Sequence, residues 1–161
     1  MFTFEYTLSS DPYFKAGYEL HIKGSIKQAI TYYEKSLSKQ KTSIVYTFLG
    51  WAHSLENNLF EAIKSCENAL MIEPDFGEAW NDIGTYMLKL GNEDEAIYFF
   101  NKAIQAKKNE MRCYPFYNLS RIWIKRGLYK KAIENLKVSI KINPNFKIAK
   151  KLLDEIKKKT H

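Results

Sequence analysis

Residues Glu78–Ala103, EAWNDIGTYMLKLGNEDEAIYFFNKA, carry the pattern that the rest of the chain repeats. An apolar stripe with the 3.6-residue period of an α-helix falls on Trp80, Ile83, Gly84 and Met87. Gly91 then ends this helix, and the acidic residues 93–95 suit the N-terminus of a second helix, where the helix dipole favours negative charge. The second stripe consists of Ala96, Phe99, Phe100 and Ala103. The stretch therefore predicts two amphipathic helices that approach closely where Gly84 and Ala96 face each other.

This order of residues resembles the tetratricopeptide repeat, whose pattern is an aromatic residue, then Leu or Ile before Gly, then a turn Gly, and then Ala-x3-Phe and Ala. Alanines in the equivalent place recur at intervals of 33, 34 and 36 residues, at Ala29, Ala62, Ala96 and Ala132. The family period is about 34 residues. The resemblance implies an all-α fold, a right-handed superhelical solenoid of four helix-turn-helix repeats with a C-terminal capping helix.

The four repeats are predicted over residues 10–42, 43–76, 77–112 and 113–144, with no linker between them. Their turns are predicted at Gly24, Asn57-Asn58, Gly91 and Gly127. Because the extra residues of the last interval fall in residues 107–112, the loop before the fourth repeat should be longer than the other loops between repeats. Leu in place of Ala62 or Ala96 should overpack a closed helix pair, whereas Ala106 is expected on the surface, where the same change should cost little.

The two ends of the chain are predicted to differ. Residues 1–9 alternate apolar and polar side chains, a strand-like period of two, and are expected to be either a frayed tail or an extended segment lying in a groove. Residues 145–161 are predicted as a capping helix with a basic tail, because their apolar residues share one side and lysines cover the other. A terminal repeat needs such a polar outer face.

Composition indicates a soluble globular protein, since 45% of the residues are hydrophobic and 27% are charged. No apolar run approaches the roughly 18 residues that a membrane-spanning helix needs, and the N-terminus lacks the pattern of a secretory signal. Cys66 and Cys113 are expected to be reduced, packed thiols. A cytoplasmic location is therefore expected.

The resemblance implies that the first helices of successive repeats line a concave groove that holds an extended peptide or a helix of a partner. Side chains next to the packing stripe should line it, and several are aromatic, as is common at binding hot spots. The candidate groove residues are Phe14, Tyr18, Phe48, Trp51, Asn81, Asp82, Tyr114, Tyr117, Asn118 and Arg121.

The best-known groove of this family binds a C-terminal carboxylate through Lys, Arg and Asn. At the corresponding places this chain has Phe14, Tyr18, Phe48, Glu78 and Asp82, or, one repeat later, Thr47, Trp51, Asp82, Tyr114 and Asn118. Neither set presents positive charge, so a receptor for a carboxylate tail is disfavoured and an aromatic-lined groove for an internal or hydrophobic peptide is favoured. Asn118 matches the Asn that similar proteins use to bond a peptide backbone, whereas Asp82 departs from it.

Two other functions stay open. One is a self-assembling scaffold, in which the repeats stack or the N-terminal tail fills a neighbouring groove. The other is binding of nucleic acid or an anionic surface by the basic C-terminal end. It is suggested by the uneven charge, because residues 1–80 carry a net charge of −3 and residues 81–161 carry a net charge of +10. A basic end attracts nucleic acid or an anionic surface, although lysines also keep a solenoid end soluble. Nucleic-acid binding is the less favoured of the two.

Catalysis is not expected. His21, His53 and His161 have no candidate nucleophile with an orienting acid, and the sequence has no Gly-rich phosphate loop, HExxH motif or pair of cysteines at zinc spacing. The chain is therefore predicted to be a non-enzymatic adaptor for a protein or peptide partner, without cofactor or metal.

Overall fold

The computed structural model describes residues 11–159, and these fold into nine α-helices with no strand among them. In chain order the helices are α2 Pro12–Ile22, α3 Ile26–Lys39, α4 Ser43–Leu55, α5 Leu59–Ile72, α6 Gly77–Lys89, α7 Glu93–Gln105, α8 Cys113–Lys125, α9 Tyr129–Ile142 and α10 Lys147–Lys159. The all-α prediction is confirmed. The predicted N-terminal segment of residues 1–9 and the last residues of the basic tail lie outside the described residues.

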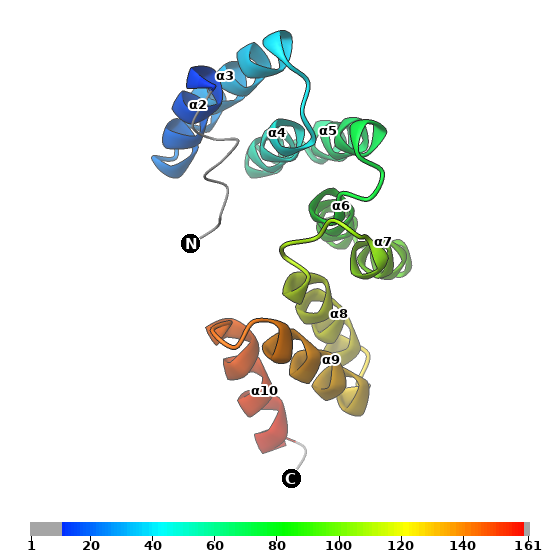
Figure 1. The fold of residues 1–161 in the computed structure, drawn as a ribbon. Helices are drawn as coiled ribbons and strands as arrows, with labels where there is room; N and C mark the ends of the chain where they lie inside the picture. Colours follow the sequence, from blue (N-terminus) through cyan, green and yellow to red (C-terminus); the bar gives the residue numbers. More distant parts are fainter. Residues whose placement is uncertain (1–10, 160–161) are drawn as a thin grey trace.

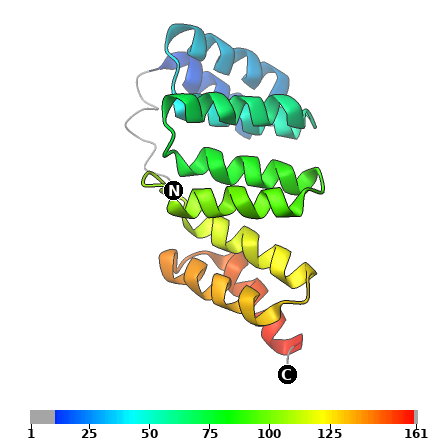
Figure 2. The same ribbon diagram turned by 90° about the vertical axis from the view of Figure 1, so that its right-hand side faces the viewer.

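The helices are arranged as successive antiparallel pairs stacked along a curved path. Figure 1 shows the pairs following one another from the N-terminal α2 and α3 to the C-terminal α10, with α4 and α6 on the inner side of the curve and α5 and α7 on the outer side. Figure 2 shows the same helices from the outer side as stacked layers. The first helices of the pairs therefore line the concave side.

A left-handed residue closes the turn inside each pair. Gly24, Gly91 and Gly127 have φ of 80°, 85° and 73°, and in the second pair Asn57 takes this place with φ 60°. Glycine adopts positive φ without strain, and Asn is one of the few other residues that tolerate it. The residue that follows donates its backbone N–H to a carbonyl five residues earlier, as in Asn92 N to Met87 O at 2.9 Å. The four turns predicted from the sequence therefore share one geometry.

Close approach within each pair depends on a small residue in the first helix. A Cβ on Gly17 would lie 2.8 Å from the Tyr33 ring, and one on Gly84 would lie 2.7 Å from the Phe100 ring. In the second pair the smaller Cys66 replaces the ring, and a Cβ on Gly50 would lie 2.9 Å from the backbone oxygen of Ala62. The glycine is therefore covered by the residue four positions after the repeating alanine.

Three clusters of buried side chains join the pairs to one another. One cluster joins α2 and α3 to α4, the second joins α5 to α6, and the third runs from α7 through α8 and α9 to α10. Helix α10 buries Ala149, Leu153 and Ile156 against the fourth pair and exposes its lysines. It therefore closes the end of the stack in the way expected of a terminal helix.

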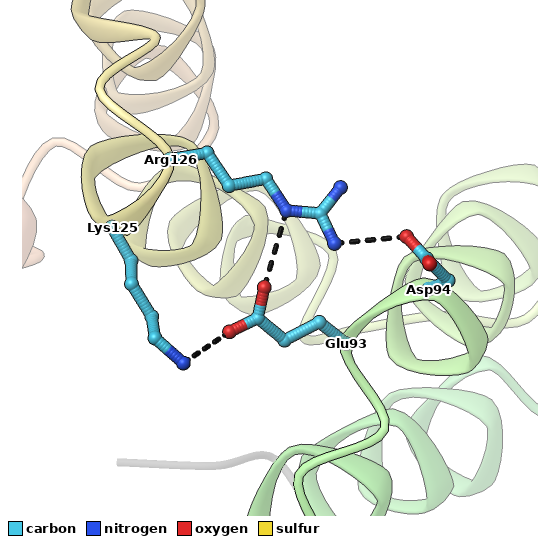
Figure 3. A network of polar contacts seen from close by, with 4 residues as sticks. All are labelled: Glu93, Asp94, Lys125 and Arg126. Carbon is cyan, nitrogen blue, oxygen red and sulfur yellow. Dashed lines mark hydrogen bonds and ion pairs between the residues drawn. The ribbon is translucent and has the colours of Figure 1, made fainter.

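An ion-pair cluster joins the third pair to the fourth at the ends of α7 and α8. Glu93, in the first turn of α7, pairs with Lys125 and with Arg126 Nε at 3.1 Å, and Arg126 Nη2 lies 2.8 Å from Asp94 Oδ1 (Figure 3). Hydrogen bonds from Lys125 and then from Arg126 lower the pKa of the Glu93 carboxyl. Because these groups are near the surface, salt should weaken the cluster.

The loop of residues 106–112, between α7 and α8, folds back onto the turn between α5 and α6. Gly77 donates its N–H to Lys108 O at 2.6 Å, and Lys108 Nζ pairs with Glu73 Oε2 at 2.7 Å. This loop is longer than residues 40–42 or 73–76, as predicted. The expectation that Ala106 is exposed is wrong, since only 4% of it is accessible, and its carbonyl accepts a hydrogen bond from Arg112 Nη2.

Helices α2–α10 are all too short or too polar to cross a membrane, so the described part of the chain holds no candidate span. Both cysteines are free and buried, as expected for packed thiols.

Gly50→Ala should lower the free energy of unfolding by about 1–3 kcal/mol, because the new methyl group would meet a backbone oxygen that cannot move aside. The measurement is urea unfolding followed by circular dichroism. Ser120→Ala is the matched control, since the fourth pair already has a buried side chain at the equivalent place. Equal midpoints for the two variants would contradict the proposed role of the small residue.

Candidate functional site

The concave side of the stack holds a pocket of about 440 Å³. Its walls come from the first helices of the four pairs and from the loop that precedes α8. The lining residues are Tyr18, Thr47, Phe48, Trp51, Ser54, Leu55, Glu78, Asn81, Asp82, Thr85, Tyr86, Lys89, Met111 and Tyr114.

One wall of the pocket is aromatic. Tyr18 and Phe48 meet edge to face with ring centroids 5.6 Å apart, and Phe48 and Trp51 lie 6.1 Å apart. The Trp51 ring rests on the ring of His21, 4.5 Å away, and His21 is held by a 3.0 Å hydrogen bond between its Nδ1 and the Tyr33 hydroxyl. Trp51 and Leu55 are nevertheless 49% and 51% exposed. This wall therefore presents rigid apolar surface to solvent.

The opposite wall, on α6, is acidic and polar. Glu78 and Asp82 are four residues apart and so share one side of the helix. Glu78 Oε1 accepts a hydrogen bond from the backbone N–H of Glu110 at 2.9 Å, whereas Glu78 Oε2 is buried without a hydrogen-bond partner. Asp82 Oδ1 accepts a long hydrogen bond of 3.4 Å from the amide of Asn81. The backbone N–H groups of Glu78 and Met111 also stabilise the Glu78 carboxylate, so Oε2 is the atom of this pair of acids that is buried without a donor.

Burial has a marked effect on these acids. Burial, together with the smaller effect of the negative charge of Glu78, raises the pKa of Asp82 to about 7 against the lowering effects of the Asn81 hydrogen bond and the Lys89 charge. Burial also raises the pKa of Glu78. The charged form of each acid is thus disfavoured in the pocket unless a cation or hydrogen-bond donor reaches it.

Lys89 is the basic residue among the described residues that line the pocket. Its Nζ lies 3.4 Å from Ser54 Oγ and 5.8 Å from the centre of the Tyr86 ring. A cluster of Lys, Arg and Asn side chains for a terminal carboxylate is therefore not formed here.

Six of the ten predicted groove residues line this pocket, namely Tyr18, Phe48, Trp51, Asn81, Asp82 and Tyr114. The other four do not. The prediction that Phe14 lines the groove is wrong, because only 2% of this residue is accessible. It packs at 5.7 Å from Tyr33 and 5.2 Å from Phe48, so the neighbouring helix α4 covers it.

The remaining three lie further along α8. Asn118 is buried, and its Nδ2 donates to Asn81 Oδ1 at 3.1 Å, so it positions Asn81 rather than facing the pocket. The Tyr117 ring packs against Phe146, with centroids 5.3 Å apart, at the junction with the terminal helix. Arg121 is exposed beyond the pocket.

Eight lining residues are not among those ten candidates, and three of the eight, Ser54, Tyr86 and Met111, also lie off the predicted groove side of a first helix. Ser54 and Tyr86 are 7% and 3% accessible, yet both line the pocket. Met111 belongs to the loop of residues 106–112. The extra length of this loop is the one feature of the sequence that could have indicated its contribution to the pocket.

The pocket shows no metal-binding arrangement. Within residues 11–159, no three His, Cys, Asp or Glu side chains lie close enough together to hold a metal ion. The site offers apolar surface, two carboxylates and an amide.

Comparison with known proteins agrees with this architecture. Residues 10–38 and 77–110 match the family model of the tetratricopeptide repeat. A crystal structure of MamA protein aligns with a TM-score of 0.66 and 24% identity over 91% of this chain and 85% of that chain. PilF of Pseudomonas aeruginosa aligns with a TM-score of 0.82 and 19% identity over 92% and 67%. A chain of the APC/C hetero-tetramer Cut9–Hcn1 aligns with a TM-score of 0.75 and 20% identity over 92% and 29%. These likenesses show the fold, a right-handed superhelical solenoid, as the sequence predicts.

Asp82→Asn should make stability less dependent on pH. Because the pKa of Asp82 is raised in the folded protein, its contribution to stability is full below about pH 4 and is lost as the pH rises through about 7. The variant should therefore match the wild type near pH 4 to 5 and be more stable by about 1–3 kcal/mol near pH 8. Urea unfolding at both pH values measures this, with Asp154→Asn on the exposed face of α10 as control. A constant difference between Asp82→Asn and wild type across this range would contradict the prediction.

Proposed function

Because this chain is built of tetratricopeptide repeats, we propose that it is a non-enzymatic binding module whose concave pocket holds a peptide segment of a partner protein. The segment lies extended or helical along the inner helices. The observation that carries the proposal is the aromatic wall of Tyr18, Phe48 and Trp51 beside the polar face of α6, in which Trp51 is 49% exposed and the other two rings are half-buried.

Three features of the pocket support peptide binding. Its volume of about 440 Å³ lies in the range of ligand pockets, so it accepts several side chains of a longer segment. Trp and Tyr are enriched at interface hot spots, and here they are already held in place by ring contacts. A surface that is rigid before binding loses less conformational entropy on binding.

Self-assembly is the second candidate, and one observation favours it. Phe60 and Met71 on the outer helix α5 are 74% and 81% exposed. Apolar side chains exposed on a convex face suit contacts between copies of the chain. Light scattering at rising concentration tests this, since a molecule that stays monomeric would contradict a scaffold.

The basic C-terminal end does not lead to a proposal of nucleic-acid binding. On α10 the exposed Lys147, Lys150, Lys151 and Lys158 share their face with Asp154 and Glu155. The mixture of signs suits a solvated end of the stack.

Trp51→Ala should weaken peptide binding at least about tenfold, which corresponds to about 1.4 kcal/mol. The probe is a displayed library of random 13-residue peptides selected on the wild-type protein, and the affinities of the selected peptides are measured by fluorescence anisotropy. Phe60→Ala is the matched control, because it removes an exposed aromatic ring outside the pocket and should leave the affinities within about twofold of wild type. If the selected peptides bind the Trp51 variant as tightly as the wild type, the proposed function is wrong.

A further inference from the structure

We propose that the bound segment carries an Arg or Lys side chain flanked by hydrophobic residues, with the cation seated between Glu78 and Asp82. This inference rests on the proposed function and specifies the chemistry of the partner. The flanking apolar side chains lie on the wall formed by Tyr18, Phe48, Trp51 and Leu55.

The first support is the state of the Glu78 carboxylate. Oε1 accepts a hydrogen bond from the backbone N–H of Glu110, and the N–H groups of Glu78 and Met111 also act on the carboxylate, whereas Oε2 is buried without a hydrogen-bond partner. A buried acceptor without a donor is costly, and a charged acceptor more so than a neutral one. A donor that arrives with the ligand would relieve this cost after a small rotation of the carboxylate.

The second support is the lack of an ion-pair partner for Asp82. Within residues 11–159 the ion pairs link Lys108 to Glu73, and Lys125 and Arg126 to Glu93 and Asp94, so neither Glu78 nor Asp82 belongs to one. The nearest basic residue, Lys89, places its Nζ by Ser54 Oγ, at 3.4 Å. The pocket therefore contains two acids and one lysine, whose charge acts on Asp82 without forming an ion pair with it.

The shape of the pocket selects a long, flexible cation attached to apolar chain. Two adjacent carboxylates repel phosphate and carboxylate groups, and their number is too small for a metal cage, which takes more oxygen ligands. The aromatic wall accepts methylene groups and the faces of planar cations. Arg combines a stacking guanidinium with five donors, so it fits this pair of acids better than Lys does.

The test uses the selected peptides described above and their substituted forms. Arg or Lys should be enriched at one position between apolar residues. Replacing that Arg by citrulline, which is similar in shape but neutral, should weaken binding to the wild type about tenfold. On the Glu78→Gln, Asp82→Asn double variant the same replacement should change the affinity less than about threefold. Thermal unfolding confirms that the double variant is folded.

The outcomes separate this inference from the proposed function. Binding that needs Trp51 but is equally tight with citrulline overturns the inference and leaves the groove function standing. A loss with citrulline that is the same on the wild type and the double variant also overturns it, because the cation then binds elsewhere. If no peptide depends on Trp51, the proposed function itself fails.

A further arm tests the chain's own N-terminal residues as the occupant. The acetylated peptide MFTFEYTLSS contains one Glu and no basic residue, so charge complementarity predicts weaker binding than that of the basic peptides. If it binds more tightly than they do and depends on Trp51, the inference of a basic partner is overturned.

Discussion

The close approach of two helices over a residue without a bulky side chain is the constraint on which the rest of this structure depends. At Gly17 and Gly84 a ring from the second helix occupies the place that a Cβ would need, and at Gly50 a backbone oxygen does so. This contact sets the distance within each pair. Stacking of identical pairs then produces the curve, and the curve places the first helices of all pairs on one concave side.

The positions of the helices and turns could be predicted from the sequence, because they depend on local chemistry. The turn residues Gly24, Asn57, Gly91 and Gly127 all adopt positive φ, which their identities favour. The pocket could be predicted only in part. Periodicity shows which residues share a side of one helix, but it does not show how much of that side the next pair of helices covers. Phe14 is therefore expected in the groove from the sequence, although α4 covers it, and so is Tyr117, which packs against Phe146 outside the pocket lining.

The pocket also shows a conflict between stability and recognition. Asp82 lies where burial and a neighbouring carboxylate both oppose its charge, and an amide or apolar residue there would fit the folded chain with less strain. Natural proteins keep such unfavourable groups mainly where they contact something else. Glu78 and Asp82 on α6 form no ion pair within the described residues, whereas Glu93 and Asp94 pair with basic side chains of the same chain.

The loop of residues 106–112 has a consequence for how this molecule can change its length over evolution. Solenoids grow and shrink by duplication or loss of whole units, and this is tolerated when each unit touches only its neighbours through interchangeable surfaces. Here the connector after α7 returns to the turn before α6, where Lys108 contacts Glu73 and Gly77 and where a Cβ on Gly77 would collide with Asn109. Loss of the third pair, or insertion of a unit within it, would remove or separate these partners. The third pair is therefore tied together at both of its connectors, and a change in the number of units that disrupts this pair would cost these contacts, whereas a unit added elsewhere would leave them intact.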